Sequence, residues 1–208
     1  MLKKIILIAV LGVLIILSGC SGEVHRKDEA HAIIPEVSDA EEENITKKET
    51  LNEDNAAKPS LGGISLGDSL EKVLDVLGDD YEKTDETDST GMIGEDTTVL
   101  TYESGIVITV GNNSKKVLRI VSASEDFRTD KGIKVGDTAK TVTEVYEIEF
   151  EKAVSRQTNE LLEGWYLIGD EAVIIFDYDK TNYTVMNFDI KPDSKVEEII
   201  LAYWRHFD

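Results

Sequence analysis

Residues 63–77 read GISLGDSLEKVLDVL, and residues 132–146 read GIKVGDTAKTVTEVY. Aligned without gaps, the two stretches are identical at six of fifteen positions, including both glycines and the aspartate. A match that keeps glycine, aspartate and the following apolar pattern in register is typical of an internal duplication. We therefore interpret the two stretches as the starts of two repeats and work outward from them.

Each stretch predicts a turn followed by a short helix. Asp68 and Asp137 stand where a helix N-cap is expected, and Glu71 completes a capping box with Asp68. Gly78 suits the left-handed end of the first helix. The spacing places on one face the apolar residues Leu70, Val73, Leu74 and Leu77 in the first copy and Ala139, Val142 and Tyr146 in the second. A pair of catalytic carboxylates is the other interpretation of the two aspartates, but capping accounts for both.

The segments after each helix predict antiparallel strands, because apolar runs alternate with turn residues. The expected strands are 97–102, 106–110 and 117–121 in the first copy and 165–168, 173–176 and 185–190 in the second. The expected fold class is α+β, with two tandem repeats (61–130 and 131–192) of a short helix followed by an antiparallel meander.

The last residues, 194–207, predict a C-terminal amphipathic helix. Ser194 and Glu197 form a capping box at its start. An apolar stripe follows at helical spacing, made of Val196, Ile199, Ile200, Tyr203 and Phe207. We expect this stripe to pack on the sheet, with a partner-binding helix as the alternative. Glu197 and Glu198 on its polar face argue against a membrane-surface helix.

The first twenty residues predict export. Lys3 and Lys4 precede an apolar run, 5–17, which is shorter than the roughly 20 residues that a membrane-spanning helix needs. Small residues then lead to Cys20, the only cysteine of the chain. A basic start, a short apolar run and small residues before a cleavage point are typical of a secretory signal peptide, 1–19, with an uncleaved anchor as the alternative.

Leu17-Ser18-Gly19-Cys20 resembles the lipobox of bacterial lipoproteins. The resemblance implies cleavage between Gly19 and Cys20, diacylglyceryl transfer to the Cys20 sulfur, and a lipid bilayer as a partner through the acylated cysteine. Two or more acyl chains give stable anchoring. We expect an exported protein anchored to the cell membrane and facing outward, on a Gram-positive-type surface in preference to a periplasm.

Residues 20–60 predict a disordered acidic tether, because they contain too little apolar surface to fold. His25 and His31 lie in it, and without further fixed ligands we interpret them as incidental and predict no metal site. The remaining 148 residues, 61–208, suffice for one domain. The chain has 42 acidic against 22 basic residues, and a surface of this charge repels nucleic acid.

The repeated Gly-Ile-x-Leu/Val-Gly-Asp-Ser/Thr motif, followed by a helix and strands, resembles the repeat of the β-lactamase inhibitor protein. It is also similar to small lipoproteins of the outer-membrane β-barrel assembly machinery. The resemblance covers residues 61–190 and implies a curved sheet whose face binds a protein. This chain departs from the inhibitor in having no disulfides, and no segment matches the inhibitor's contact loops. The resemblance therefore does not imply that this protein inhibits β-lactamase.

No catalytic motif is found in residues 61–208. Their one histidine, His206, stands next to the chain end, and no nucleophile elbow, zinc-protease motif or phosphate loop occurs. Residues 177–182 begin like a calcium loop but lack its glycine and final glutamate, so they predict a hairpin turn. We predict no cofactor and no catalytic residues.

Two hypotheses of function follow. The first is a non-enzymatic lipoprotein that binds another protein through its sheet face, which predicts an apolar or aromatic patch there. The alternative is an envelope hydrolase that acts on cell-wall glycan with paired carboxylates. It predicts a cleft that holds two carboxylates, one of them with a raised pKa.

Overall fold

The computed structural model describes residues 58–169, 171–182 and 184–207. The predicted signal peptide, Gly19, Cys20 and most of the predicted tether lie outside these residues. The described part contains the elements α1 (Leu70–Leu77), β1 (Glu82–Glu86), β2 (Thr97–Thr101), β3 (Ile106–Gly111), β4 (Val117–Ser122), α2 (Ala139–Tyr146), β5 (Lys152–Val154), β6 (Leu161–Ile168), β7 (Ala172–Asp177), the 3-10 turn η2 (Lys180–Asn182), β8 (Glu198–Tyr203) and the 3-10 turn η3 (Trp204–His206). Among the described residues, no helix is long and apolar enough to cross a membrane.

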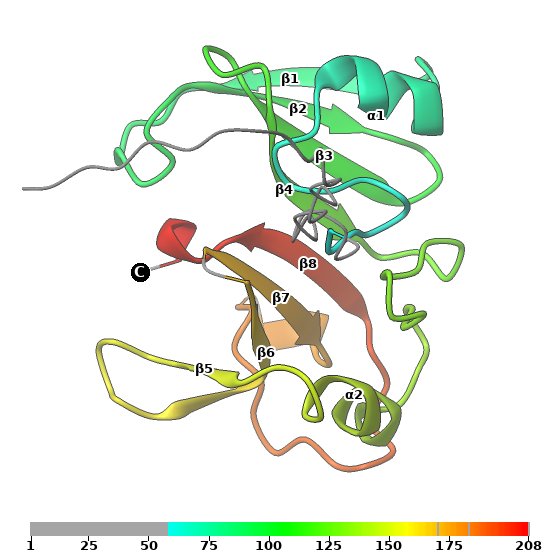
Figure 1. The fold of residues 1–208 in the computed structure, drawn as a ribbon, viewed down its shortest axis with the longest axis vertical. Coiled ribbons are helices and arrows are strands. Elements are labelled where there is room, and N and C mark those ends of the chain that lie inside the picture. The colour runs from blue at the N-terminus through cyan, green and yellow to red at the C-terminus, as the bar shows by residue number, and fades with distance from the viewer. Residues whose placement is uncertain (1–57, 170, 183, 208) are drawn as a thin grey trace, which may run out of the picture. The chain divides into compact units, whose positions relative to one another are not determined.

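The eight strands form one antiparallel sheet in the order β1-β2-β3-β4-β8-β7-β6-β5 (Figure 1). The expected α+β fold class of two tandem helix-plus-meander repeats is therefore wrong. The described chain is mostly β, with only two short helices, and its strands belong to a single continuous sheet. The last strand, β8, pairs with both β4 and β7 and so joins strands β1–β4 to strands β5–β7.

The predicted C-terminal helix over 194–207 is also wrong, since β8 and η3 occupy this segment. Ile199, Ile200, Leu201 and Ala202 are all fully buried, two on each face of the sheet. A central strand that is buried on both faces has a continuous run of apolar residues. It lacks the alternation of apolar and polar residues by which a half-buried strand is recognised in a sequence. Ser194 caps no helix: its Oγ accepts a hydrogen bond from Lys191 N at 3.0 Å in a turn before β8.

The two repeated motifs adopt the same local structure, but the predicted N-caps are displaced by one residue. Ser69 and Thr138 cap α1 and α2, accepting hydrogen bonds from Lys72 N (3.2 Å) and Thr141 N (3.1 Å). The carboxylates of Asp68 and Asp137 turn back instead and accept from the amides three residues earlier, both at 2.9 Å. Each aspartate therefore closes the glycine turn that precedes its helix.

The motifs also attach both helices to the sheet in the same way. Val117 N donates to Asp68 O, and Val196 N donates to Asp137 O, each at 2.9 Å. The amides of Gly67 and Gly136 donate back to the carbonyls of the same two valines at 2.8 Å. The segments that enter β4 and β8, the two central strands, are thus each fixed by one motif.

The sheet has two different faces. One face carries the larger core, which includes Val73 of α1, Val142 of α2 and Phe176 of β7. The opposite face, which we call the open face, carries a smaller cluster formed by Ala153, Leu162, Trp165, Val173, Ile175, Ile200 and Ala202. Neighbouring residues of β7 alternate between the two clusters, as successive side chains of a strand do.

Two of the remaining sequence predictions need correction. The predicted strand over 185–190 is part of a long connection, 178–197, between β7 and β8. The edge strands β1 and β5 were not predicted. β1 consists of Glu82-Lys83-Thr84-Asp85-Glu86, is exposed at every residue and lacks the apolar alternation by which strands are recognised.

Candidate functional site

The open face presents a row of side chains that is apolar from β3 to β6. Six residues stand opposite one another across neighbouring strands, in the order Thr101, Val107, Val121, Ile200, Ile175 and Trp165. On the β4 side of the row, Val107 and Val121 are half-buried, and Val99 beside them is half-buried too. On the β7 side, Ile175 and Trp165 are buried. The open face is therefore partly covered near β6 to β8 and accessible near β2 to β4.

The middle of the β7–β8 connection covers the open face near β6 to β8. Two side chains fix this connection to the sheet. Trp165 Nε1 donates to Val185 O at 3.0 Å. Asn187 Nδ2 donates to Glu163 O (2.8 Å) and to Phe176 O (2.9 Å), while its Oδ1 accepts from Tyr178 N at 2.8 Å. The flanking side chains of Met186 and Phe188 are thereby placed over the open face.

Gly164 allows this close approach. Its φ is +80°, and a Cβ there would lie 2.6 Å from Phe176 O and 2.8 Å from Asn187 Nδ2. Positive φ is easily adopted by glycine, and only a residue without Cβ leaves room for the Asn187 amide between β6 and β7. Gly164 and Asn187 together therefore set the position of the connection.

The chain end supplies the second wall. Trp204 N donates to Glu171 O at 2.7 Å, and Phe207 N closes η3 on Trp204 O at 3.1 Å. The Trp165 ring packs edge to face against Trp204 and Phe207, with centroid distances of 6.0 and 5.1 Å. Such geometry is favourable for aromatic pairs and holds the end of the chain on the open face.

Three cavities meet around Phe207, and together we call them the Phe207 groove. The aromatic cavity, about 530 Å³, is lined by Leu161, Trp165, Met186, Phe188 and Trp204, among others. The charged cavity, also about 530 Å³, is lined by Arg119, Asp177, Lys180, Thr184, Val185, Met186 and Glu198. The small cavity, about 100 Å³, is lined by Glu86, Ile93, Thr109, Leu118, Arg119 and His206. Phe207 lines all three.

The aromatic cavity exposes apolar surface. Leu161 and Phe188, on its rim, are 60% and 70% exposed, although both are large apolar side chains. Trp165 and Trp204, the two tryptophans of the sequence, lie in its wall. Large aromatic side chains next to exposed apolar groups are typical of surfaces that bind another molecule.

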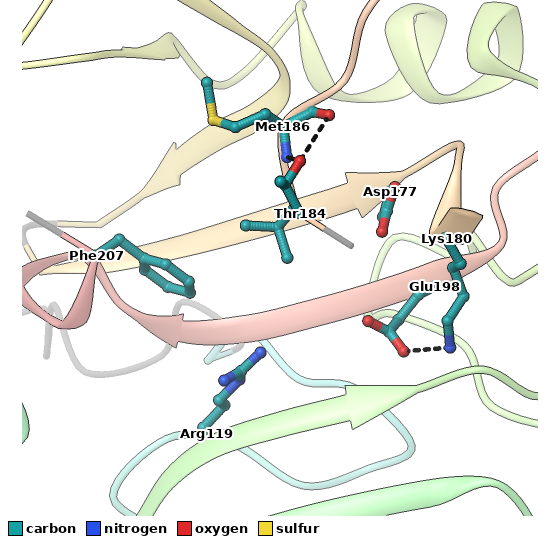
Figure 2. Close-up of a pocket in the computed structure, with 8 residues that line it drawn as sticks. Arg119, Asp177, Lys180, Thr184, Met186, Glu198 and Phe207 are labelled. Carbon is teal, nitrogen blue, oxygen red and sulfur yellow. Dashed lines mark hydrogen bonds and ion pairs between the residues drawn. The ribbon is translucent and has the colours of Figure 1, made fainter. Parts of the chain in front are cut away.

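The charged cavity combines groups from four elements (Figure 2). Lys180 Nζ forms an ion pair with Glu198 at 2.6 Å, and Lys180 N donates to Glu197 Oε2 at 2.9 Å. Figure 2 shows Arg119 reaching from β4 toward β8, and its guanidinium lies 5.8 Å from the centre of the Phe207 ring. Burial lowers the pKa of Arg119, an effect that the nearby charge of Glu198 partly offsets.

Asp177 and Glu198 form the pair of carboxylates that best fits the hydrolase hypothesis. They stand directly opposite each other on β7 and β8 and line one cavity. Asp177 is only 2% exposed, and burial raises its pKa, with a smaller contribution from Glu198. Asp177 Oδ1 also accepts from Asp179 N at 3.0 Å, so this carboxylate shapes the turn that follows β7.

Most residues singled out by sequence lie away from the groove; the exceptions are Glu198, His206, Phe207 and the 177–182 turn. Asp68, Asp137 and Ser194 line none of its three cavities. Asp177–Asn182 ends β7 and forms η2, but the hairpin turn predicted for 177–182 is wrong, because the next strand along the chain is β8, which begins at Glu198. In the described ranges, no group of three or more histidine, aspartate or glutamate side chains is placed to hold a metal ion.

Sequence reasoning missed Arg119, Met186, Phe188 and Trp204. One signal was present: Arg119 interrupts the apolar strand Val117-Leu118-Arg119-Ile120-Val121. A charge inside such a strand indicates a face of the sheet that is not covered by the main core. The other three residues reach the site through the β7–β8 connection and η3, whose path no sequence pattern indicates.

Comparisons with known proteins add little. No family model matches the chain, and no curated protein matches it. The crystal structure of the uncharacterized protein yfeY from Escherichia coli aligns with 68% of this chain and 95% of that chain, with 16% sequence identity and a TM-score of 0.40. A likeness of this size supports no conclusion about function.

Proposed function

We propose that this protein is a membrane-anchored envelope lipoprotein without enzymatic activity, whose domain binds an extended segment of another protein in the Phe207 groove. The observation that carries the proposal is the aromatic cavity with its exposed rim residues Leu161 and Phe188. The lipobox-like sequence that ends at Cys20 supports the membrane anchor. The tether holds the domain away from the bilayer, where it reaches a partner.

The shape and chemistry of the groove favour a segment of a polypeptide. The aromatic and charged cavities share Met186 and Phe207, so one ligand that crosses these two residues contacts both. An extended peptide with a large apolar side chain fits an apolar pocket that adjoins a polar one.

The charge of the chain argues against a second copy as the partner. Removal of residues 1–19 takes away two lysines and leaves a net charge of −22. Two molecules of this charge repel each other. A different protein therefore fits the groove better than a second copy of this chain.

Site-specific cross-linking in the source cell tests this function. A photoreactive phenylalanine analogue replaces Phe188 in the full-length lipoprotein, and in a matched control it replaces Ile148, which is 86% exposed and lines none of the groove cavities. We expect position 188 alone to cross-link to one envelope protein, at a segment containing a large apolar residue. We also expect Leu161→Asp to abolish this product, because it places a charge on the apolar rim.

The proposal fails if positions 148 and 188 give the same products or if neither gives any. It also fails if the product at position 188 is a second copy of this chain. Circular dichroism of the purified Leu161→Asp variant provides the control for folding. Since Leu161 is exposed, we expect its spectrum to match that of the unsubstituted protein.

A glycan hydrolase remains a second candidate, favoured only by the Asp177–Glu198 pair and the raised pKa of Asp177. The charge-neutral changes Asp177→Asn and Glu198→Gln test it. If the protein is a hydrolase, purified protein releases soluble fragments from cell-wall glycan, and each substitution abolishes this release. If the unsubstituted protein releases no fragments, this candidate is eliminated.

A further inference from the structure

Arg119 is a half-buried cation whose charge lacks a direct partner among the described residues. It stands between Thr109 of β3 and Ala202 of β8 on the open face. Among the described residues, no carboxylate lies within 4 Å of its guanidinium, and Nε is buried with no hydrogen-bond partner. Its guanidinium lies over the Phe207 ring, 5.8 Å from the ring centre. A buried donor without a hydrogen-bond partner destabilises the fold, so its presence calls for an explanation.

A second nitrogen without a partner lines the same small cavity. His206 Nε2 is buried and has no hydrogen-bond partner in the described part of the chain. It belongs to η3, whereas Arg119 belongs to β4, so two separate elements bring these nitrogens to one cavity of about 100 Å³. The Thr109 side chain lines the cavity as well and adds a hydroxyl group.

We propose that the small cavity binds a carboxylate group carried by the protein segment in the Phe207 groove. The inference rests on the proposed function and specifies the ligand further: a carboxylate adjacent to a large apolar side chain. Guanidinium groups bind carboxylates through charge-assisted hydrogen bonds, which are the stronger ones in proteins. Phe207 lines both the small cavity and the aromatic cavity, so the apolar side chain of the same segment lies in the aromatic cavity when the carboxylate lies in the small one.

Charges of both signs surround the small cavity. Arg119 and Arg205 act on His206 as positive charges, while Asp88 acts as a negative one, and Glu86 lines the wall. Burial, with the two arginines, lowers the pKa of His206. A bound carboxylate has the opposite effect on this pKa, because a negative charge stabilises the protonated imidazole.

Nuclear magnetic resonance with small carboxylates tests the inference on the mature chain carrying Cys20→Ser, which lacks the lipid. The probes are acetate, 3-phenylpropionate and, as a neutral control, 3-phenylpropionamide. We expect both carboxylates to shift the Arg119 Nε–H signal saturably and to raise the pKa of His206. The amide should do neither. Arg119→Lys assigns the signal, and the signal of the exposed Arg128 should stay unchanged.

The phenyl group of 3-phenylpropionate tests whether one ligand occupies both the small cavity and the aromatic cavity. We expect 3-phenylpropionate to bind about tenfold more tightly than acetate, since burying an aromatic ring contributes at least about 1.4 kcal/mol. It should also change the intrinsic fluorescence, because both tryptophans lie in the groove. Leu161→Asp should reduce the advantage of 3-phenylpropionate over acetate while leaving acetate binding unchanged.

Three outcomes overturn the inference: no saturable shift with acetate, equal shifts at Arg119 and Arg128, or equal affinity for acetate and 3-phenylpropionate. Failure here is distinguishable from failure of the proposed function. If the cross-link at position 188 persists in Arg119→Gln with undiminished yield, the groove binds its partner without a carboxylate contact. For a positive result, peptides with a free or amidated C-terminus distinguish a terminal carboxylate from an acidic side chain.

Discussion

At the scale of single residues, Gly164 and Asn187 decide where the site forms. Asn187 spans β6 and β7 with three hydrogen bonds, and it reaches both strands only because residue 164 has no side chain. Nothing in the sequence around position 164 indicates this role. The glycine lies inside a strand, where glycine often marks a close backbone approach, but its partner is 23 residues away in a segment that was predicted to be a strand.

Replacement of Gly164 by alanine should therefore be strongly destabilising. The new methyl group would lie within 3 Å of Phe176 O and Asn187 Nδ2, in addition to the strain of a positive φ. We expect the free energy of unfolding to fall by about 3 kcal/mol, measured by urea denaturation.

Gly169→Ala is the matched control. Gly169 also has a positive φ, +74°, but apart from its chain neighbours no atom of the described residues lies within 4 Å of its Cβ position. This change should lower the free energy of unfolding by about 1 kcal/mol, because alanine is strained at a positive φ but meets no steric clash there. Equal effects of the two substitutions would show that the contact with Asn187 is not what makes Gly164 necessary.

At the scale of elements, β8 is the strand that sequence reasoning misread and the one on which the sheet depends most. The helices and most strands were predictable because each has one buried and one exposed face. In such elements apolar and polar residues recur in the sequence with the period of a helix or a strand, as in α1 and β3. β8 has no exposed face along Ile199-Ile200-Leu201-Ala202, so its sequence contains no period that distinguishes strand from helix.

Removal of residues 194–208 should abolish cooperative folding. Five buried apolar side chains would be lost, those of Val196, Ile199, Ile200, Leu201 and Ala202, and β4 and β7 would both lose a partner. Burial of an aliphatic side chain contributes about 1.5–3 kcal/mol, so the loss approaches the whole stability of a typical domain. We expect the truncated chain to show no sigmoidal urea transition by circular dichroism.

Removal of residues 204–208 alone provides the comparison. It deletes η3 and one wall of the Phe207 groove but leaves β8 in place. This shorter truncation should still unfold cooperatively while losing the binding of 3-phenylpropionate. A cooperative transition in the longer truncation would instead mean that the β1–β4 half folds without β8.

At the scale of the whole molecule, we expect the proposed anchor and the acidic body to have separate roles. The acidic body repels anionic headgroups, so association with a membrane should depend on a lipid at Cys20. We expect Cys20→Ser to move the protein from the membrane fraction to the soluble fraction and to abolish labelling with radioactive palmitate. A protein that stays in the membrane fraction without this cysteine would indicate an uncleaved anchor.

The ends of the sheet also matter for a protein that we expect to be crowded on a surface. Lipid anchoring raises the local concentration of identical chains and aligns them, which favours the addition of one sheet to the next. The exposed strand β1 carries four charges in five residues, three of them negative, and β5 at the other end has only three residues. Charged and very short edge strands prevent sheets from joining. We therefore expect neighbouring anchored copies to stay separate, so that each open face remains accessible.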